Sequence, residues 1–282
     1  RFESRGLGDV YKRQKLHRSF NKGDDWEEIS KDLTSGGKKG NVPYGTITSF
    51  DESNFQFGKL IVGSDDGIVS ISNDSGKTWK SVSDNLPPDL WVSRVIFSKH
   101  EKNTIYLSLN GYRYNDFKPY IYVSNDNGDS WENISSNLPL SPVNVIREDI
   151  NRKEILYVGT DNGLFISFNN GKKWHPFESS LNRVAVHDLV IQNEKNDLLV
   201  GTHGRSIYKT NLDLFNDFMI EKNGEKPLII FEINDLRHSN SWGKRSNYSD
   251  DVFKSSVKTI VYSDKSIISV SYTHLRAHET RT

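Results

Sequence analysis

An octapeptide that occurs four times constrains the fold of this chain more than any other feature. Its copies are Ser19–Trp26, Ser72–Trp79, Ser124–Trp131 and Ser167–Trp174, and all four fit the pattern Ser-x-(Asp/Asn)-x-Gly-x-x-Trp. The tryptophans that end the copies lie 53, 52 and 43 residues apart. A period of this length is typical of arrays in which each repeat is one small sheet of four strands.

The sequence between the copies repeats as well. Apolar runs at 60–64, 104–108 and 156–160 are each followed by a second short run that leads directly into an octapeptide. A further apolar run, such as 92–97, follows the octapeptide. Only two alanines occur, whereas Val, Ile, Tyr, Phe and Trp are common, as in strands. We therefore predict an all-β fold, a β-propeller fragment of about four four-stranded blades. The strands of each blade are called A to D, with A innermost and the octapeptide between C and D.

Folding alone explains the residue types of the octapeptide. The Asp or Asn oxygen accepts N–H groups of its own turn, the Gly supplies a positive φ, and the Trp buries a ring between neighbouring sheets. The positions to which we assign this structural role are Asn21, Gly23, Trp26, Asp74, Gly76, Trp79, Asp126, Gly128, Trp131, Asn169, Gly171 and Trp174.

The octapeptide resembles the Asp-box, or BNR, repeat, and its flanks resemble the bacterial sortilin-like group of propellers. The flanking residues that carry the resemblance are Val158–Phe165 and Leu199–Tyr208. The resemblance covers residues 15–212. Related propellers include peptide-binding receptors, sialidases and other exo-acting glycoside hydrolases, so it implies a fold and leaves the activity open. Unlike animal sortilins, this chain carries no cysteine-rich module after the propeller.

Both ends of the chain read as translated sequencing adaptor. An oligonucleotide that encodes residues 4–14 also encodes residues 270–279 on its opposite strand, and it resembles a transposon-library adaptor. We therefore interpret 1–14 and 270–282 as artefact. The predicted domains are the C-terminal part of a larger propeller at 15–212, and a linker with the start of a β-sandwich-like module at 213–269. Without the ends the chain loses six basic and three acidic residues, which changes its net charge from zero to −3.

Composition argues against several classes of function. The absence of cysteine excludes thiol nucleophiles, disulfides and thiolate zinc sites from this chain. A charge near zero argues against a nucleic-acid partner, and no apolar run is long enough for a transmembrane segment. The histidines show no metal-ligand spacing, with His187 and His203 far apart in the sequence. We expect neither a cofactor nor a metal.

The B–C turns and D–A connections of a propeller lie at the end of the blades opposite the octapeptides, where ligands usually bind. In one repeat the B–C turn expands to residues 110–119, which hold Tyr112, Arg113, Tyr114 and Phe117. Such a mixture is common at recognition surfaces, and Trp91 on a D–A connection could join it. Alternatively, the loop packs its own aromatic rings.

Other turns on the same face hold polar candidates. His203 and Arg205 could bind a carboxylate, or Arg205 could pair with Asp161 or Asp188 to support the fold. Asp65, Asp66 and Asp161 are the weak candidates for the carboxyl pair that a glycosidase requires.

Three hypotheses follow. The first is a non-catalytic recognition propeller that binds peptide or glycan, on an exported or cell-surface protein in an extracellular or periplasmic setting. The second is the C-terminal half of an exo-acting glycoside hydrolase. The third is a structural spacer in a secreted protein.

Overall fold

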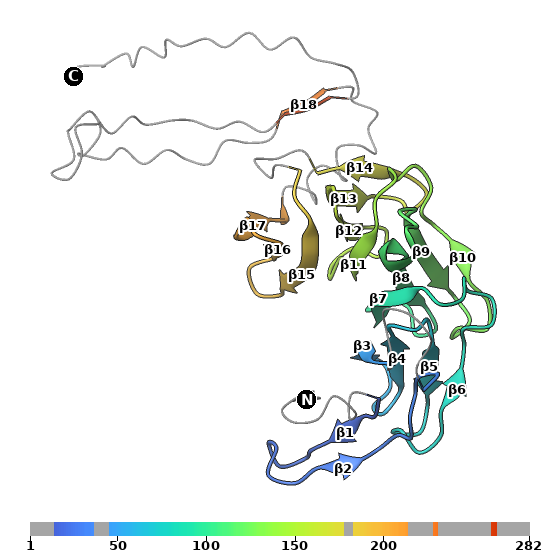
Figure 1. Cartoon of the computed structure of the whole chain (residues 1–282). Helices are drawn as coiled ribbons and strands as arrows, with labels where there is room; N and C mark the ends of the chain where they lie inside the picture. The colour runs from blue at the N-terminus through green and yellow to red at the C-terminus, as the bar shows by residue number, and fades with distance from the viewer. Residues whose placement is uncertain (1–13, 37–44, 178–182, 214–227, 231–260, 264–282) are drawn as a thin grey trace, which may run out of the picture. The chain divides into compact units, whose positions relative to one another are not determined.

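The computed structural model describes residues 14–36, 45–177, 183–213, 228–230 and 261–263 (Figure 1). The chain divides into two units, 1–210 and 211–282. In the second unit, β18 (Leu228–Ile230) pairs antiparallel with β19 (Val261–Ser263). Of the ends interpreted as artefact, 1–14 and 270–282, all residues except Gln14 lie outside the described residues.

The first unit consists of consecutive antiparallel sheets in which strand order follows chain order, which confirms the predicted all-β blades. The three four-stranded sheets are β3 (Ile47–Glu52), β4 (Leu60–Ser64), β5 (Val69–Ser72) and β6 (Lys80–Ser81); β7 (Trp91–Phe97), β8 (Ile105–Asn110), β9 (Tyr120–Ser124) and β10 (Glu132–Asn133); and β11 (Val143–Glu148), β12 (Leu156–Thr160), β13 (Gly163–Ser167) and β14 (Trp174–Pro176). The two-stranded sheet β1 (His17–Arg18) and β2 (Glu27–Glu28) precedes them, and β15 (Val186–Gln192), β16 (Asp197–Thr202) and β17 (Ile207–Asn211) follow as a three-stranded sheet.

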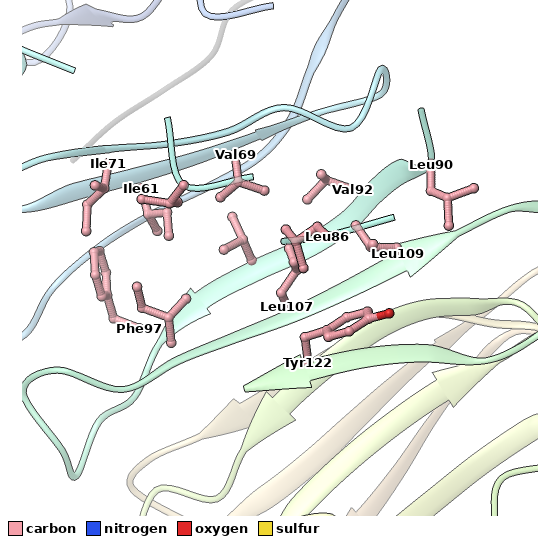
Figure 2. Packing of buried hydrophobic residues seen from close by; sticks show 13 residues of the cluster. Ile61, Val69, Ile71, Leu86, Leu90, Val92, Phe97, Leu107, Leu109 and Tyr122 are labelled. Carbon is pink, nitrogen blue, oxygen red and sulfur yellow. The ribbon is translucent and has the colours of Figure 1, made fainter. Parts of the chain in front are cut away.

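Neighbouring sheets meet through their A strands and through apolar side chains between their faces. Strands β3, β7, β11 and β15 contact one another in sequence. The cluster in Figure 2 joins β4 and β5 of one sheet to β7 and β8 of the next, with Tyr122 of β9 at its edge. Its labelled members are Ile61, Val69, Ile71, Leu86, Leu90, Val92, Phe97, Leu107, Leu109 and Tyr122. Strands β4, β5, β8, β12 and β13 are buried along their length and therefore contain mostly apolar and small residues.

Three of the four octapeptides, or boxes, also join their sheet to the preceding one. Three box tryptophans donate Nε1–H to a carbonyl just after the preceding D strand: Trp79 to Ile29 (3.1 Å), Trp131 to Val82 (2.8 Å) and Trp174 to Ile134 (2.8 Å). A Cβ on box residue Gly76 would lie 2.6 Å from the Ile29 oxygen, so glycine is required by close approach as well as by its positive φ. Trp26 of the first box donates only to Gly23 of its own turn and is 39% exposed.

A second set of hydrogen bonds joins the sheets at their inner edge. Each A strand contains a one-residue bulge. In three sheets the bulge side chain donates to a carbonyl of the next A strand: Thr48 to Val92 (2.6 Å), Ser93 to Val143 (2.7 Å) and Asn144 to Val186 (3.2 Å). His187 is the bulge residue of the fourth sheet.

Within a box, the side chain at the third position organises the turn. Asp126 Oδ1 accepts the backbone N–H of Ser130 (2.9 Å), and Asp126 Oδ2 accepts the Ser130 hydroxyl (2.5 Å). These bonds lower the pKa of Asp126 to about 2. Asn169 accepts the N–H of Lys173 in the same way (2.9 Å). The two boxes with Asp therefore have Ser or Thr four residues later, where a hydroxyl can use the second carboxylate oxygen, and the two boxes with Asn do not.

Candidate functional site

The B–C insertion between β8 and β9 is held in shape by its own backbone and polar side chains. A 3₁₀ turn at Tyr112–Tyr114 is followed by Asn115 in a left-handed conformation (φ 58°). Asn110 Oδ1 accepts the N–H of Tyr112 (3.0 Å), and the Tyr120 hydroxyl donates to Asp116 (2.6 Å). That hydroxyl lowers the pKa of Asp116, while burial and the same carboxylate raise the pKa of Tyr120 to about 12. The insertion is thus an ordered turn rather than a simple extension of the strands.

Three of the predicted ligand residues form one cluster with an acidic turn of the preceding sheet. The guanidinium of Arg113 lies 4.9 Å from the centre of the Trp91 ring, and that ring lies 6.4 Å from the ring of Tyr112. Arg113 Nη1 also pairs with Asp65 Oδ2 of the β4–β5 turn at 3.2 Å. The D–A connection, the B–C insertion and the neighbouring B–C turn therefore meet here, which we call the rim cluster (Trp91, Tyr112, Arg113 and Asp65).

The rim cluster combines one buried, unpaired donor with exposed apolar surface. Trp91 Nε1 is buried with no hydrogen-bond partner among the residues that the structure describes. An unpaired buried donor costs about 1–3 kcal/mol, and a ligand or a water that accepted its hydrogen would remove that cost. Tyr112, Tyr114 and Phe117 are about half exposed, at 49%, 54% and 52%. Tyr114 and Phe117 therefore add apolar surface beside the cluster without being buried in the insertion.

The three acidic candidates accept hydrogen bonds from their own framework. Asp65 Oδ1 accepts the N–H of Thr46 (2.7 Å), and Asp66 Oδ2 accepts the N–H and the hydroxyl of Ser35 (2.8 and 2.6 Å). Both aspartates are buried. Asp161 Oδ1 accepts from Asn144 Nδ2 (2.8 Å), and Asn144 in turn accepts from Asn110 of the insertion (2.9 Å). These contacts position the turns and the insertion relative to one another.

His203 and Arg205 lie in the β16–β17 turn, and both are exposed. Within the described residues, no hydrogen bond, ion pair or ring contact joins either of them to the rim cluster. The ring of His203 instead packs against His187 at 5.4 Å. The two carboxylates considered as partners of Arg205 accept from other residues, Asp161 from Asn144 and Asp188 from Arg94.

Sequence reasoning missed a charged group on the A strands. Arg94 Nη2 of β7 and Arg147 Nη2 of β11 lie 2.7 and 3.6 Å from one oxygen of Asp188 on β15. The Arg94 bond spans non-adjacent sheets because the A strands converge. Burial lowers the pKa of Arg147. Asp51 on β3 lies near Arg147, and burial raises the pKa of its carboxyl group. The Asp51 carboxylate also accepts the N–H of Phe97 (2.9 Å). Arg94 and Arg147 lie one and three residues after the bulge residues Ser93 and Asn144 of their A strands, which places both on one face.

In the described part of the chain, no group of three or more His, Cys, Asp or Glu side chains is arranged to hold a metal ion. Nor does that part contain a helix of the length and apolarity that a bilayer crossing demands.

A family comparison agrees with this geometry. The sequence model of the Sortilin-Vps10 family, described as sortilin, neurotensin receptor 3, matches residues 119–273, more than half of the chain. The chain belongs to the Sortilin-Vps10 family. This confirms the sortilin-like resemblance read from the boxes and their flanks, and it makes the described sheets a receptor-like propeller domain.

Individual relatives share only part of this Sortilin-Vps10 chain. The vacuolar protein sorting/targeting protein PEP1 of Saccharomyces cerevisiae is 31% identical over 99 residues, which is 35% of this chain and 5% of the yeast protein. The chain thus spans about a twentieth of the length of that curated relative.

Solved structures show the same fold at low identity. A GH74 enzyme of Niastella koreensis is 12% identical with a TM-score of 0.54, covering 72% of this chain and 33% of the enzyme. An ancestral GH74 enzyme is 15% identical with a TM-score of 0.56, covering 71% of this chain and 27% of the enzyme. These similarities support a β-propeller of the Asp-box kind and carry no information about activity.

Proposed function

We propose that this domain is a non-catalytic recognition propeller that binds a peptide on the face formed by its B–C turns and D–A connections. The observation that carries the proposal is the rim cluster, where a guanidinium, an indole with an unpaired N–H and the half-exposed Tyr112 meet. Aromatic residues and arginine dominate the binding energy of protein interfaces. Family membership supports a peptide rather than a glycan, and a lumenal or extracellular compartment, with an exported or cell-surface protein as the setting.

The acidic candidates support this function over glycoside hydrolysis. A glycosidase requires one carboxyl group free to protonate the leaving oxygen and a second facing it across the bond. Asp65 accepts from Thr46 and Arg113, and Asp66 from Ser35 and Ser64. Two carboxylates engaged in this way serve better as anchors of the rim than as an acid and its partner.

Selection of a phage-displayed random peptide library against the purified chain, followed by titration of the selected peptides, tests the proposal. Arg113→Ala is expected to weaken binding by at least about tenfold, as for a central interface residue. Phe57→Ala is the matched control, because Phe57 is 73% exposed in the β3–β4 turn, at the opposite end of the blade.

Equal binding by wild type and Arg113→Ala, with loss in Phe57→Ala, would place the ligand on the box end and overturn the proposed face. Enrichment on a glycan array with no peptide enrichment would favour the carbohydrate alternative.

A further inference from the structure

Two histidines that are distant in the sequence lie side by side, with tilted rings, on the last sheet of the first unit. His187 belongs to β15 and His203 to the β16–β17 turn, with ring centroids 5.4 Å apart and ring planes at 42°. Both side chains are exposed. The backbone of the second histidine is fixed, because His203 N–H donates to the Ala185 carbonyl (2.9 Å) and the Thr202 hydroxyl donates to the Ser206 carbonyl (2.6 Å).

The bulge in β15 accounts for the position of His187. Val186 pairs with Thr202 and Asp188 with Gly201, so His187 is the additional residue between them. The equivalent side chains of the other three sheets donate to the next A strand. β15 is the last A strand of the first unit, so the described residues offer His187 no next A strand, and its imidazole packs beside that of His203.

The spacing of the rings suits a shared metal ion. Zinc binds imidazole nitrogen at about 2.0–2.1 Å, so each ring centroid lies roughly 3.2 Å from the metal, and a tetrahedral angle sets the two centroids about 5 Å apart. The observed separation is 5.4 Å. Imidazole nitrogen favours zinc, nickel and copper over calcium and magnesium, which prefer oxygen.

We infer that His187 and His203 bind one divalent transition-metal ion of the zinc, nickel or copper class. The carboxylate that follows His187 in β15, Asp188, is shared by Arg94 and Arg147 and does not complete the site. Two protein ligands leave the remaining coordination positions to water or to a group from a bound molecule.

The test uses the full chain carrying His274→Asn and His278→Asn. These two histidines are four residues apart outside the described residues, and on a helix that spacing would itself bind nickel or copper. We compare this background protein with the same protein carrying His187→Asn or His203→Asn. Each is titrated with zinc chloride in a calorimeter, and the copper complex of each is examined by electron paramagnetic resonance. His17→Asn is the matched control, because His17 lies on β1 with a carboxylate at 3.9 Å as its charged neighbour.

We expect one zinc ion per chain, two nitrogen donors in the copper spectrum, and at least about a tenfold weaker titration for either site variant. His17→Asn should bind as the background does. If the far-UV circular dichroism of a site variant is identical to that of the background protein, unfolding is excluded as the cause of its weaker zinc binding. Unchanged zinc binding in both site variants, a copper spectrum with one nitrogen, or no saturable binding by the background would each overturn the inference.

Discussion

Removal of the Trp174 side chain tests the role of the boxes in joining one sheet to the next. Trp174 is 2% exposed, lies in the apolar cluster between the second and third four-stranded sheets, and donates Nε1–H to Ile134 of the preceding sheet (2.8 Å). Deletion of a buried aromatic side chain costs about 3–5 kcal/mol, so we expect Trp174→Ala to lower the free energy of unfolding by that amount.

Two further variants divide this cost into its parts. Trp174→Phe keeps much of the ring and removes the N–H, which leaves the Ile134 carbonyl without its donor and should cost about 1–2 kcal/mol. Trp26 is the matched control, since it has the same place in its box but is 39% exposed and bonded only to Gly23. Trp26→Ala should therefore cost roughly 1 kcal/mol or less.

The assay is urea unfolding followed by far-UV circular dichroism, because tryptophan fluorescence changes with the substitutions themselves. Repeat arrays can unfold in segments, so the m value of each variant must match that of the wild type before the free energies are compared. Equal losses for Trp174→Ala and Trp26→Ala would refute the claim that the box tryptophan stabilises the contact between sheets.

Two predictions concern charges. The pKa of Asp126 lies near 2 in the folded chain, below the value of about 4 in an unfolded one, so its contribution is present above pH 4 and lost as the pH falls towards 2. In Asp126→Asn the Ser130 hydroxyl loses its carboxylate acceptor, and no carboxyl group remains to be protonated at this position. The variant should therefore lose less stability than the wild type between pH 4 and pH 2. Asp188→Asn removes the carboxylate shared by Arg94 and Arg147, so thermal unfolding should show a loss of about 1 kcal/mol or less that shrinks in high salt. A salt-independent loss would contradict the ion-pair explanation.

Most of the fold could be predicted because its determinants are local. The Gly and the Asp or Asn of each box define one turn, and the apolar runs define the strands on either side, so the repeat could be recognised without any long-range information. The bulges and the bonds that they make to the next sheet could not be read, because Thr48, Ser93, Asn144 and His187 share no residue type. What they share is a register position.

The candidate site was predictable only in part, because some of its contacts depend on strand register and not on residue type. Blade topology brought Trp91 and the 110–119 insertion to one end, and the structure places Trp91, Tyr112 and Arg113 in contact there. Contacts between residues distant in the sequence were not predictable from spacing. Arg94 reaches Asp188 because the A strands converge, and His187 lies beside His203 because Val186 pairs with Thr202 within one sheet.

Photo-crosslinking of a selected peptide, followed by mass spectrometry of the linked fragments, tests the proposed binding face most directly. The account predicts crosslinks to Trp91 and to residues 110–119, and their loss when Arg113→Ala is used in place of the wild type. Crosslinks that fall on the box turns, such as 72–79 or 124–131, or on the β3–β4 turn around Phe57, would contradict it.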